Sequence, residues 1–410
     1  MSNQKREPGG CGCASIPFSV ILLFLGGGYW LFTQRDNLEI SRFLNHEIIA
    51  DIPFLNTWAT STDKSPPTLP NIPEIPQTTN PEPKPQPQPQ PEAQPETPPK
   101  SPTIKPPSPI PSSPLNTWEG KPIRGIYLSR YQATNNASEE TIRARVRYYR
   151  DRGINTIIHG VWGNACTMYE SQVMQAKFGY SSCQNLFEEE WIDWLIDEAH
   201  KHGMEVHAYF EKGIKIDENS HAFDWAVQRG WIVPGVDRTH PGVDHYVLNV
   251  GIPEVAQFFT DIVVEFVQKY PTIDAVQWDD YLGYHDELPG QIDRTPKLTN
   301  FVRNMIAQMK AANPSVSFDI CHHNPYWAKQ YFAADLEAWG VDRFFIQVYA
   351  EENFDDEMVY VEASDGISIT ERQLNRLPEL IDNPNIPNIL LFPLSGEPER
   401  LADKVHELTI

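Results

Sequence analysis

The sequence predicts an α/β fold, a TIM-type (β/α)8 barrel that follows an N-terminal transmembrane helix and a proline-rich linker. Three observations lead to this prediction. From Arg124 onward, short apolar strands alternate with amphipathic helices, which is the pattern of a parallel sheet. Residues 65–115 are too rich in proline to form a core, and residues 15–33 form an uncharged apolar run. The barrel domain is therefore expected at 116–410.

Seven barrel strands can be identified in the sequence. Each is short and rich in apolar or β-branched residues, as expected for strands buried on both faces of a parallel sheet. They are RGIYLS (124–129), INTIIHGVW (154–162), EVHAYFE (205–211), IDAVQWDD (273–280), VSFDICH (316–322), FFIQVYA (344–350) and NILLFPL (388–394). Amphipathic helices are predicted between them at 139–153, 188–203, 253–270 and 298–314.

An eighth strand is missing from this series. After the seventh strand, residues 398–410 have a helical pattern and the sequence stops. The barrel therefore either lacks or modifies its last βα unit, or a segment such as HYVLNV (245–250) or YVEAS (360–364) helps to close it.

Residues 15–33 carry no charge, and a run of this length is about enough to span ~30 Å of hydrocarbon. A cleavable signal peptide is the alternative, but no small-x-small cleavage site follows the run. Basic residues before the run favour a cytoplasmic tail at 1–14 and an exported C-terminal part. We expect a single-pass inner-membrane protein whose barrel lies in the periplasm or the cell-wall space, with a juxtamembrane segment at 34–64.

The linker at 65–115 holds twenty of the 37 prolines. Such a segment favours the extended polyproline II conformation and acts as a spacer, reaching roughly 100–150 Å when fully extended. A ligand for a proline-binding domain is the alternative function for this composition.

The chain is acidic, with 55 acidic and 33 basic residues and a formal net charge of −22. This balance argues against nucleic acid and anionic lipid surfaces as partners, because both repel a negative protein. A neutral polymer is more compatible. We expect a monomer that uses no cofactor.

Asp279 and Asp280 are the most informative pair of residues. They follow an apolar strand, and in an α/β barrel the carboxyl ends of the strands carry the active site. Burying an unpaired carboxylate is costly, so two at one strand end need partners or a reaction. Because neighbouring strand residues point to opposite faces, both can face the mouth only if the strand breaks between them. The alternative is a helix N-cap beside a surface charge.

This pattern resembles the bacterial glycosyl hydrolase-like family 10. The matching segments are, in order, RGIYLS, VWGNACTMYES, AHKHGMEVHAYFE, YVLNVGIPEV, IDAVQWDDYLGYH and FFIQVY, spanning residues 124–350. The sequence departs from the family pattern at Val250, where proline is usual, and in its short C-terminus. The resemblance implies hydrolysis of a sugar polymer outside the cytoplasm, with cell-wall glycan as the leading candidate.

Glycosidic cleavage needs a proton donor for the leaving oxygen and an anionic group for the oxocarbenium-like centre. We assign Asp280 as the general acid/base, Asp279 as the group that positions or stabilises the reacting sugar, and Glu211 as the distant carboxylate partner. Adjacent aspartates here also resemble those of retaining N-acetylhexosaminidases that use the substrate's own acetamido group. Candidate substrate-binding residues, mostly aromatic, are Trp162, Asn164, Tyr169, Tyr209, Trp278, Tyr281, His285, Gln347 and Tyr349.

Metal and cysteine chemistry play smaller parts in the prediction. No HExxH spacing is present, and the HxH pair His200 and His202 falls in the helix predicted at 188–203, where residues two apart do not face each other, so no metal site is assigned. His207 is expected to form hydrogen bonds inside the barrel. Cys166 and Cys183 are disulfide candidates in an exported domain, with two free thiols as the rival that non-reducing peptide mapping would distinguish; Cys321 is expected to be a buried thiol.

The sequence therefore predicts a membrane-anchored glycoside hydrolase acting on a cell-envelope polysaccharide, with peptidoglycan glycan strands as the first candidate. Two alternatives stay open. One is a catalytically inactive barrel that binds glycan, and the other is a metal-dependent hydrolase on the same fold.

Overall fold

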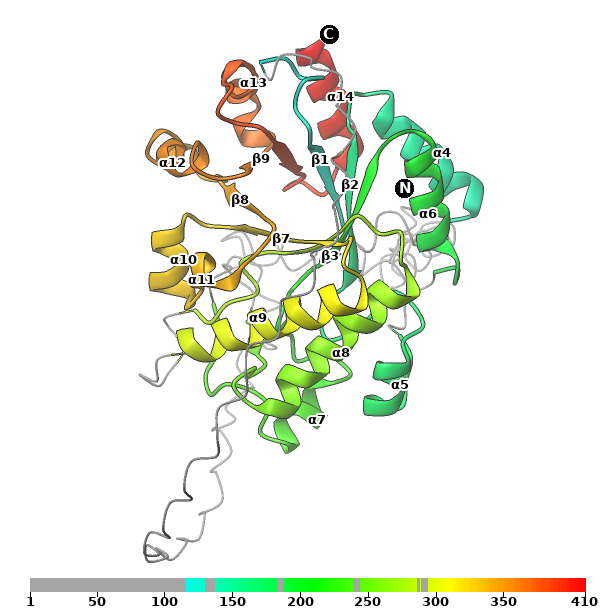
Figure 1. Ribbon diagram of the computed structural model, residues 1–410, viewed down its shortest axis with the longest axis vertical. Coiled ribbons are helices and arrows are strands. Elements are labelled where there is room, and N and C mark those ends of the chain that lie inside the picture. The colour runs from blue at the N-terminus through cyan, green and yellow to red at the C-terminus, as the bar shows by residue number, and fades with distance from the viewer. Residues whose placement is uncertain (1–115, 130–136, 183–186, 239–243, 286–287, 289–293) are drawn as a thin grey trace, which may run out of the picture. The chain divides into compact units, whose positions relative to one another are not determined.

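The computed structural model describes residues 116–410 except 130–136, 183–186, 239–243, 286–287 and 289–293. In this part of the chain, eight parallel strands close into a barrel in the order β1-β10-β9-β8-β7-β6-β3-β2 (Figure 1). The strands are β1 (Arg124–Leu128), β2 (Thr156–Trp162), β3 (Glu205–Phe210), β6 (Ala275–Trp278), β7 (Ser317–His322), β8 (Arg343–Gln347), β9 (Gly366–Thr370) and β10 (Ile389–Phe392).

Helices connect successive strands along the outside of the barrel (Figure 1). They are α4 (Glu139–Arg150), α5 (Gln172–Phe178), α6 (Trp191–Lys201), α7 (Phe223–Gln228), α8 (Pro253–Lys269), α9 (Thr295–Ala312), α10 (Pro325–Phe332), α11 (Leu336–Trp339), α12 (Phe354–Val361), α13 (Leu377–Asp382) and α14 (Pro398–Thr409), with short 3-10 helices at Glu351–Asn353 and Glu371–Arg376. The TIM-type barrel predicted from the sequence is thus confirmed, and the four predicted helices correspond to α4, α6, α8 and α9.

The barrel is complete, and the strand missing from the prediction is β9. It lies between the sixth and seventh predicted strands, so the last βα unit is neither absent nor modified. Neither suggested substitute closes the barrel. Residues 360–361 belong to α12, and β5 (Tyr246–Val247) pairs with β4 (Lys215–Ile216) in a separate two-stranded sheet.

The composition of β9 explains why it escapes notice. Ile367 and Ile369 face outward into the main core, whereas Ser368 faces inward, where its hydroxyl hydrogen-bonds that of Tyr349 at 3.0 Å. A small polar residue is needed there because the Tyr349 ring occupies the space. The resulting GISIT segment is short and has only two large apolar residues, Ile367 and Ile369.

The first and last strands meet at Asn388, just before β10. Its side-chain oxygen accepts a hydrogen bond from the Ile123 backbone N–H at 2.8 Å, and its amide donates to the Asp365 carbonyl at 2.6 Å. The backbone adds a bond from Ile389 N–H to the Ile123 carbonyl at 3.0 Å. One buried side chain therefore links the segments before β1 and β9 to β10, where the barrel closes.

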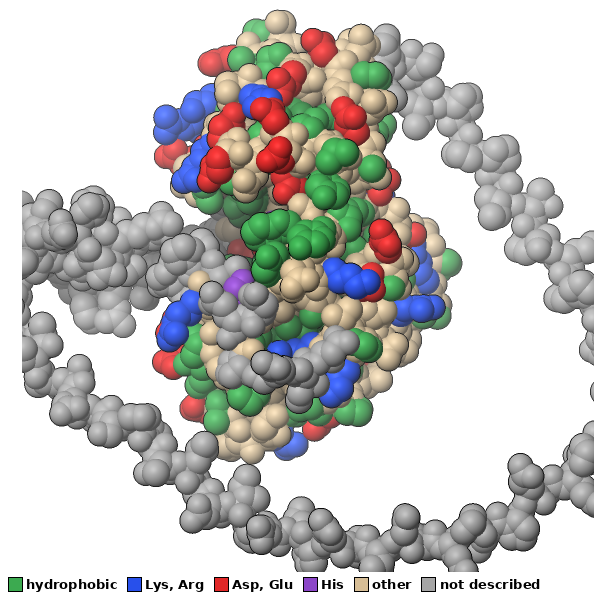
Figure 2. Space-filling model, turned by 90° about the vertical axis from the view of Figure 1, so that its left-hand side faces the viewer, with side chains coloured by type: hydrophobic (Ala, Val, Ile, Leu, Met, Phe, Trp, Pro, Cys, Tyr) green, Lys and Arg blue, Asp and Glu red, His purple; other side chains and the backbone are tan. Residues whose placement is uncertain are grey.

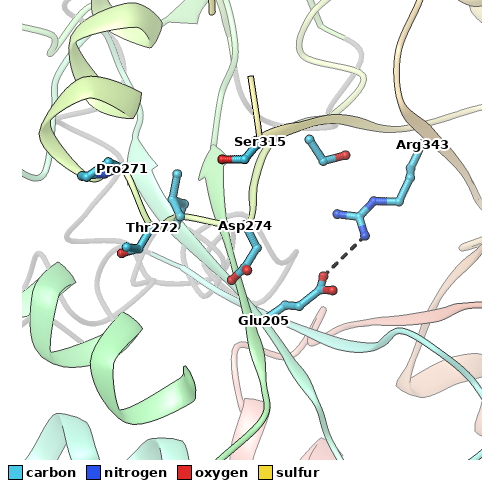
Figure 3. Close-up of a pocket in the computed structure, with 8 residues that line it drawn as sticks. Glu205, Pro271, Thr272, Asp274, Ser315 and Arg343 are labelled. Carbon is cyan, nitrogen blue, oxygen red and sulfur yellow. Dashed lines mark hydrogen bonds and ion pairs between the residues drawn. The ribbon is translucent and has the colours of Figure 1, made fainter. Parts of the chain in front are cut away.

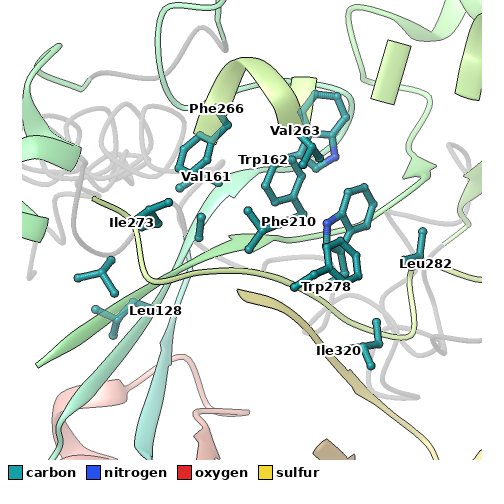
Figure 4. Packing of buried hydrophobic residues seen from close by; sticks show 14 of the residues in the cluster. Leu128, Val161, Trp162, Phe210, Val263, Phe266, Ile273, Trp278, Leu282 and Ile320 are labelled. Atoms are coloured by element: carbon teal, nitrogen blue, oxygen red, sulfur yellow. The ribbon is translucent and has the colours of Figure 1, made fainter. Parts of the chain in front are cut away.

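The hydrophobic core has two parts. The larger lies between the strands and the helices, where Trp162, Phe210 and Trp278 pack against α8 through residues such as Phe266 (Figure 4). The smaller lies inside the barrel and includes Tyr127, Ile158, Tyr209, Cys321, Phe345 and Leu390. Side-chain alternation along each strand divides its residues between the two parts.

Cysteine pairing and membrane insertion are only partly visible. Cys166 is disulfide-bonded, and its partner is not among the described residues, which leave out Cys183; pairing between these two stays a prediction. Cys321 is a free and buried thiol, as predicted. No helix in the described ranges has the length and apolar character needed to cross a bilayer, and the predicted span 15–33 lies outside them.

Gly366 provides a test of the closure. A Cβ at this position would lie 2.4 Å from the Asn388 carbonyl oxygen, and its φ of +153° is one that side chains rarely adopt. Gly366→Ala should therefore lower the free energy of unfolding by about 2 kcal/mol or more in urea titrations. Gly340→Ala is the control, because its φ is also positive but nothing lies within 4 Å. Equal losses in the two variants would contradict this account of the closure.

Candidate active site

The two aspartates lie where β6 ends. Gln277 faces the barrel interior and donates to the Tyr127 hydroxyl, and Asp279, two residues further on, faces the same way. The backbone then turns, since the Asp279 carboxylate accepts from Tyr281 N–H at 2.9 Å and its carbonyl from Leu282 N–H at 2.9 Å. Strand alternation therefore no longer applies to Asp280, and both carboxyl groups reach the mouth of the barrel.

A cavity of about 520 Å³ lies at this mouth, at the carboxyl ends of the strands. Both aspartates line it together with residues that follow β1, β3, β7, β8 and β10. The lining residues are Tyr127, Ser129, Tyr209, Glu211, Lys212, Asp279, Asp280, Tyr281, Cys321, His323, Gln347, Tyr349, Phe392, Pro393, Leu394 and Gly396. The volume is typical of a site for a small molecule or a short segment of a polymer.

The surroundings of Asp279 favour its protonated form. Burial and the neighbouring charge of Asp280 raise the pKa of Asp279 to about 7, even though the Tyr209 hydroxyl and the Tyr281 N–H donate to its carboxylate. Burial and the Asp279 charge also raise the pKa of Tyr209 well above its ordinary value, so this phenol stays neutral and acts as a donor. Asp279 is thus poised to hold a proton near neutral pH.

Asp280 has the opposite tendency. Burial disfavours its charge, but His323 and Lys215 outweigh burial and hold the pKa of Asp280 well below its usual range. The His323 Nε2 lies 3.4 Å from its carboxylate, and the Gln347 amide donates to the same oxygen at 3.1 Å. The pKa values of the two adjacent carboxyls therefore shift in opposite directions, because the histidine and amide contacts are made to Asp280 and not to Asp279.

Lys215, which contributes to the lowered pKa of Asp280, does not line the cavity. Lys215 is fully buried, pairs with the buried Asp237 at 3.0 Å, and places its ammonium 4.3 Å from the centre of the Tyr281 ring. The backbone is tight here, because a Cβ on Gly213 would lie 2.5 Å from the Tyr281 carbonyl oxygen. The segment after β3 thus holds Tyr281, the residue that follows the aspartate pair.

Aromatic rings form much of the cavity wall. Tyr127 packs edge-on against Tyr209 at 5.1 Å and against Phe392 at 5.5 Å. Tyr349 stacks on Phe392 at 5.4 Å and hydrogen-bonds Ser368. Such rings present flat apolar faces with polar edges, which suits the faces and hydroxyls of a sugar ring.

Most of the predicted site residues come together in this cavity. Glu211, Asp279, Asp280, Tyr209, Tyr281, Gln347 and Tyr349 all line it. Asn164 does not, since its side chain bonds Asn219 and the Asp217 N–H and so fixes the loop after β2. His285 packs against Phe332 and does not line the cavity either.

Three predicted substrate-binding aromatics are core residues, which corrects the prediction. Trp162 is buried against α8 and donates to the Gly213 carbonyl at 2.9 Å. Tyr169 is buried with its hydroxyl near the Ile262 carbonyl, and Trp278 stacks on Phe210 at 4.9 Å. Trp278 follows the inward-facing Gln277, so alternation directs it outward into the helix layer.

Several lining residues were not identified from the sequence. Tyr127 and Phe392 lie in mostly apolar strands and Leu394 follows one, so periodicity does not show which side chains face inward. His323 and its neighbour His322 diverge: His322 is buried, and His323 faces the cavity. Lys212 was also missed, and its distinguishing feature is seen only in the structure: its backbone has a φ of +66°, which is uncommon for a residue with a side chain.

A second pocket, of about 380 Å³, lies at the opposite end of the barrel (Figure 3). It is lined by Glu205 and Arg343, the first residues of β3 and β8, which form an ion pair at 3.4 Å. Arg343 also binds the buried Asp319 at 2.9 Å, and His207 bonds Glu205 and Gln277, as predicted for a histidine inside the barrel. These polar groups satisfy one another, so this end of the barrel is structural.

Within the described residues, no group of three or more histidine, cysteine, aspartate or glutamate side chains is arranged to hold a metal ion. What the cavity offers is a pair of unlike carboxyls, a third carboxylate at Glu211 and an aromatic wall. A closed barrel with acids at the carboxyl ends of its strands fits the class of glycosidase-like barrels.

Residues 122–295 match the model of the family described as Glycosyl hydrolase-like 10, which confirms the resemblance predicted from the sequence. The match includes both aspartates. Curated relatives named Glycosyl hydrolase DigH, from Escherichia coli strain K12 and from Shigella flexneri, are each 31% identical over 206 residues, covering 42% of this chain and 44% of the relative. The chain thus spans less than half the length of these relatives.

Among solved structures, a glycoside hydrolase family 20 β-N-acetylglucosaminidase has a TM-score of 0.44 at 11% identity and covers 72% of this chain and 70% of its own. An α-amylase from Lactobacillus plantarum has a TM-score of 0.44 at 11% identity and covers 69% and 72%. Likenesses this distant carry no information about activity.

The raised pKa of Asp279 predicts a measurable dependence of stability on pH. An unfolded aspartate titrates near ~4, so between about pH 4 and 7 the folded protein holds more protons at this site, and its contribution to stability falls as pH rises. Asp279→Asn should remove this fall. Its free energy of unfolding relative to wild type should improve by about 1 kcal/mol or more from pH 5 to pH 8.

Urea unfolding at the two pH values measures this difference. Asp356→Asn, on the exposed surface of α12, serves as the control and should parallel the wild type. If Asp279→Asn also parallels the wild type, Asp279 does not carry the buried proton.

Proposed function

We propose that this protein is a glycoside hydrolase that cleaves a cell-envelope polysaccharide, with the glycan strands of peptidoglycan as the first candidate. One observation carries the proposal: two adjacent carboxyls at the base of an aromatic cavity, one raised in pKa and the other lowered. Glycosidic cleavage needs one carboxyl that gives a proton and one that stays anionic. The family match agrees with it.

The environments of the two aspartates support an exchange of the roles expected from the sequence. Asp279, with a pKa near 7, is suited to donate the proton to the leaving oxygen. Asp280, held anionic by His323 and Lys215, is suited to stabilise the positive charge that develops at the sugar. Glu211 lines the same cavity and is the third carboxylate available, either to activate water or to form a covalent intermediate.

Substrates with different leaving groups can distinguish the residue that donates the proton from the residue that stabilises the developing charge. Wall glycan, with and without attached peptide, would first be digested and the products identified by mass. We expect Asp279→Asn and Asp280→Asn each to lower turnover of the natural strand by ~10²–10⁴. On a 2,4-dinitrophenyl glycoside of the released sugar, which needs no proton donor, Asp279→Asn should recover most of its activity and Asp280→Asn should not.

The surface variant Asp356→Asn should match the wild type on both substrates. If only Asp280→Asn recovers activity on the dinitrophenyl glycoside, Asp280 and not Asp279 is the general acid. Wild-type protein that binds the strands and releases no product would be an inactive glycan-binding barrel. Activity that disappears with EDTA and returns with a divalent metal would favour the metal-dependent alternative.

The proposed location is the cell envelope, with residues 15–33 as a single-pass anchor and 65–115 as a spacer. The uncharged run and the proline content of the sequence support this. Deleting residues 15–33 should move the protein from the membrane fraction to the soluble fraction on cell fractionation. Protein that stays with the membranes after the deletion would show that another segment attaches it.

A further inference from the structure

Two large aromatic side chains lie exposed beside the cavity, at the start of α10. Tyr326 is 62% exposed and Trp327 is 46% exposed, and they are the second and third residues of the helix. Helices in this barrel begin near the carboxyl ends of the strands, so the first turn of α10 lies at the mouth. Figure 2 shows hydrophobic side chains gathered near the middle of the face that carries α10 and α12. An exposed pair of this kind indicates a binding surface.

The pair is held firmly in place. Asn324 caps α10 by accepting from the Trp327 N–H at 3.0 Å, and Pro325 occupies the first helical position. The Asn324 amide donates to both carboxylate oxygens of Glu357 on α12, at 2.8 and 3.0 Å. The Trp327 ring also contacts that of Tyr331 at 4.6 Å. The rings are therefore presented on a fixed support, which lowers the entropic cost of binding.

The pair continues directly from the catalytic aspartates. His323 lines the cavity, and its Nε2 lies 3.4 Å from the Asp280 carboxylate. The same histidine ring is 6.2 Å from the ring of Trp327, which does not line the cavity. His323 is thus the next side chain outward from Asp280, and Trp327 is the next one after His323.

The size of the cavity indicates what reaches this surface. A volume of about 520 Å³ holds a short segment of a ligand, so a polymer must leave the cavity over its rim. Phe392, the last residue of β10, and Leu394, just after it, line the cavity at a point three strands from β7 in the barrel order. A chain that passes Leu394 and the aspartates therefore has the rings after β7 as its continuation on the other side.

We infer that Tyr326 and Trp327 form an outer sugar-binding platform that holds the part of a glycan strand extending beyond the cavity. The inference rests on the proposed function and deepens it, because such a platform selects long strands and places cleavage within them. Flat rings with polar edges suit stacking against sugar faces, and neither ring carries a charge at neutral pH.

Strands of graded length test the platform. The full-length protein and its Tyr326→Ala and Trp327→Ala variants would be given peptide-free wall glycan as disaccharide, tetrasaccharide and octasaccharide, with affinity and kcat/KM measured separately. We expect both variants to lose roughly three- to tenfold in affinity and in kcat/KM for the octasaccharide, which is the range for one aromatic contact. Neither should change for the disaccharide, which stays inside the cavity.

Tyr360→Ala is the matched control, because Tyr360 is an exposed aromatic residue near the far end of α12. Equal losses for all lengths, no loss for any length, or an equal loss in Tyr360→Ala would overturn the platform. Octasaccharide binding that depends on Trp327 without any cleavage would uphold the platform and overturn hydrolysis. Cleavage of the octasaccharide unaffected by either variant would do the reverse.

Discussion

Two carboxyl groups on adjacent, partly buried residues of one cavity cannot both carry a full charge without compensation. The structure meets this constraint by treating them unequally. Asp279 receives neutral donors, from the Tyr209 phenol and a backbone N–H, whereas Asp280 receives the histidine and the amide, and the field of the buried Lys215 acts on both. This asymmetry suits a chemically equivalent pair to the two different roles proposed for it.

The asymmetry depends on the closed barrel, because the groups that create it come from strands far apart in the sequence. Tyr209 comes from β3, His323 follows β7, and Gln347 ends β8. Their distances to the aspartates are set by strand pairing, which in turn depends on the closure between β1 and β10 at Asn388. Below the site, Tyr127 and Gln277 continue as a polar column to His207 and the Arg343–Asp319 pair. The barrel interior is thus hydrogen-bonded from one end to the other.

Sequence patterns predict the order and type of most elements, because the barrel strands are mostly apolar on both faces and a covering helix has one apolar face. Because both faces of a strand are mostly apolar, the sequence does not show which side chains point into the barrel. Trp162 and Trp278 look like sugar-stacking residues at strand ends, yet both face the helix layer, and Tyr127 faces the cavity without any mark in its strand. The aspartate pair was identifiable because buried charge is rare. The groups that shift the pKa values of the pair were not identifiable from the sequence, because Lys215 and His323 come close to it only after folding.

The ion pair of Lys215 with Asp237 lies behind Tyr281, outside the cavity wall. Part of the electrostatic field at both aspartates therefore originates in the scaffold and not in residues that line the cavity. Such an arrangement separates two kinds of evolutionary change. In the proposed hydrolysis, a change at the rim would alter which glycan is bound, whereas a change to the buried Lys215–Asp237 pair would alter the pKa values of the two aspartates for every substrate alike.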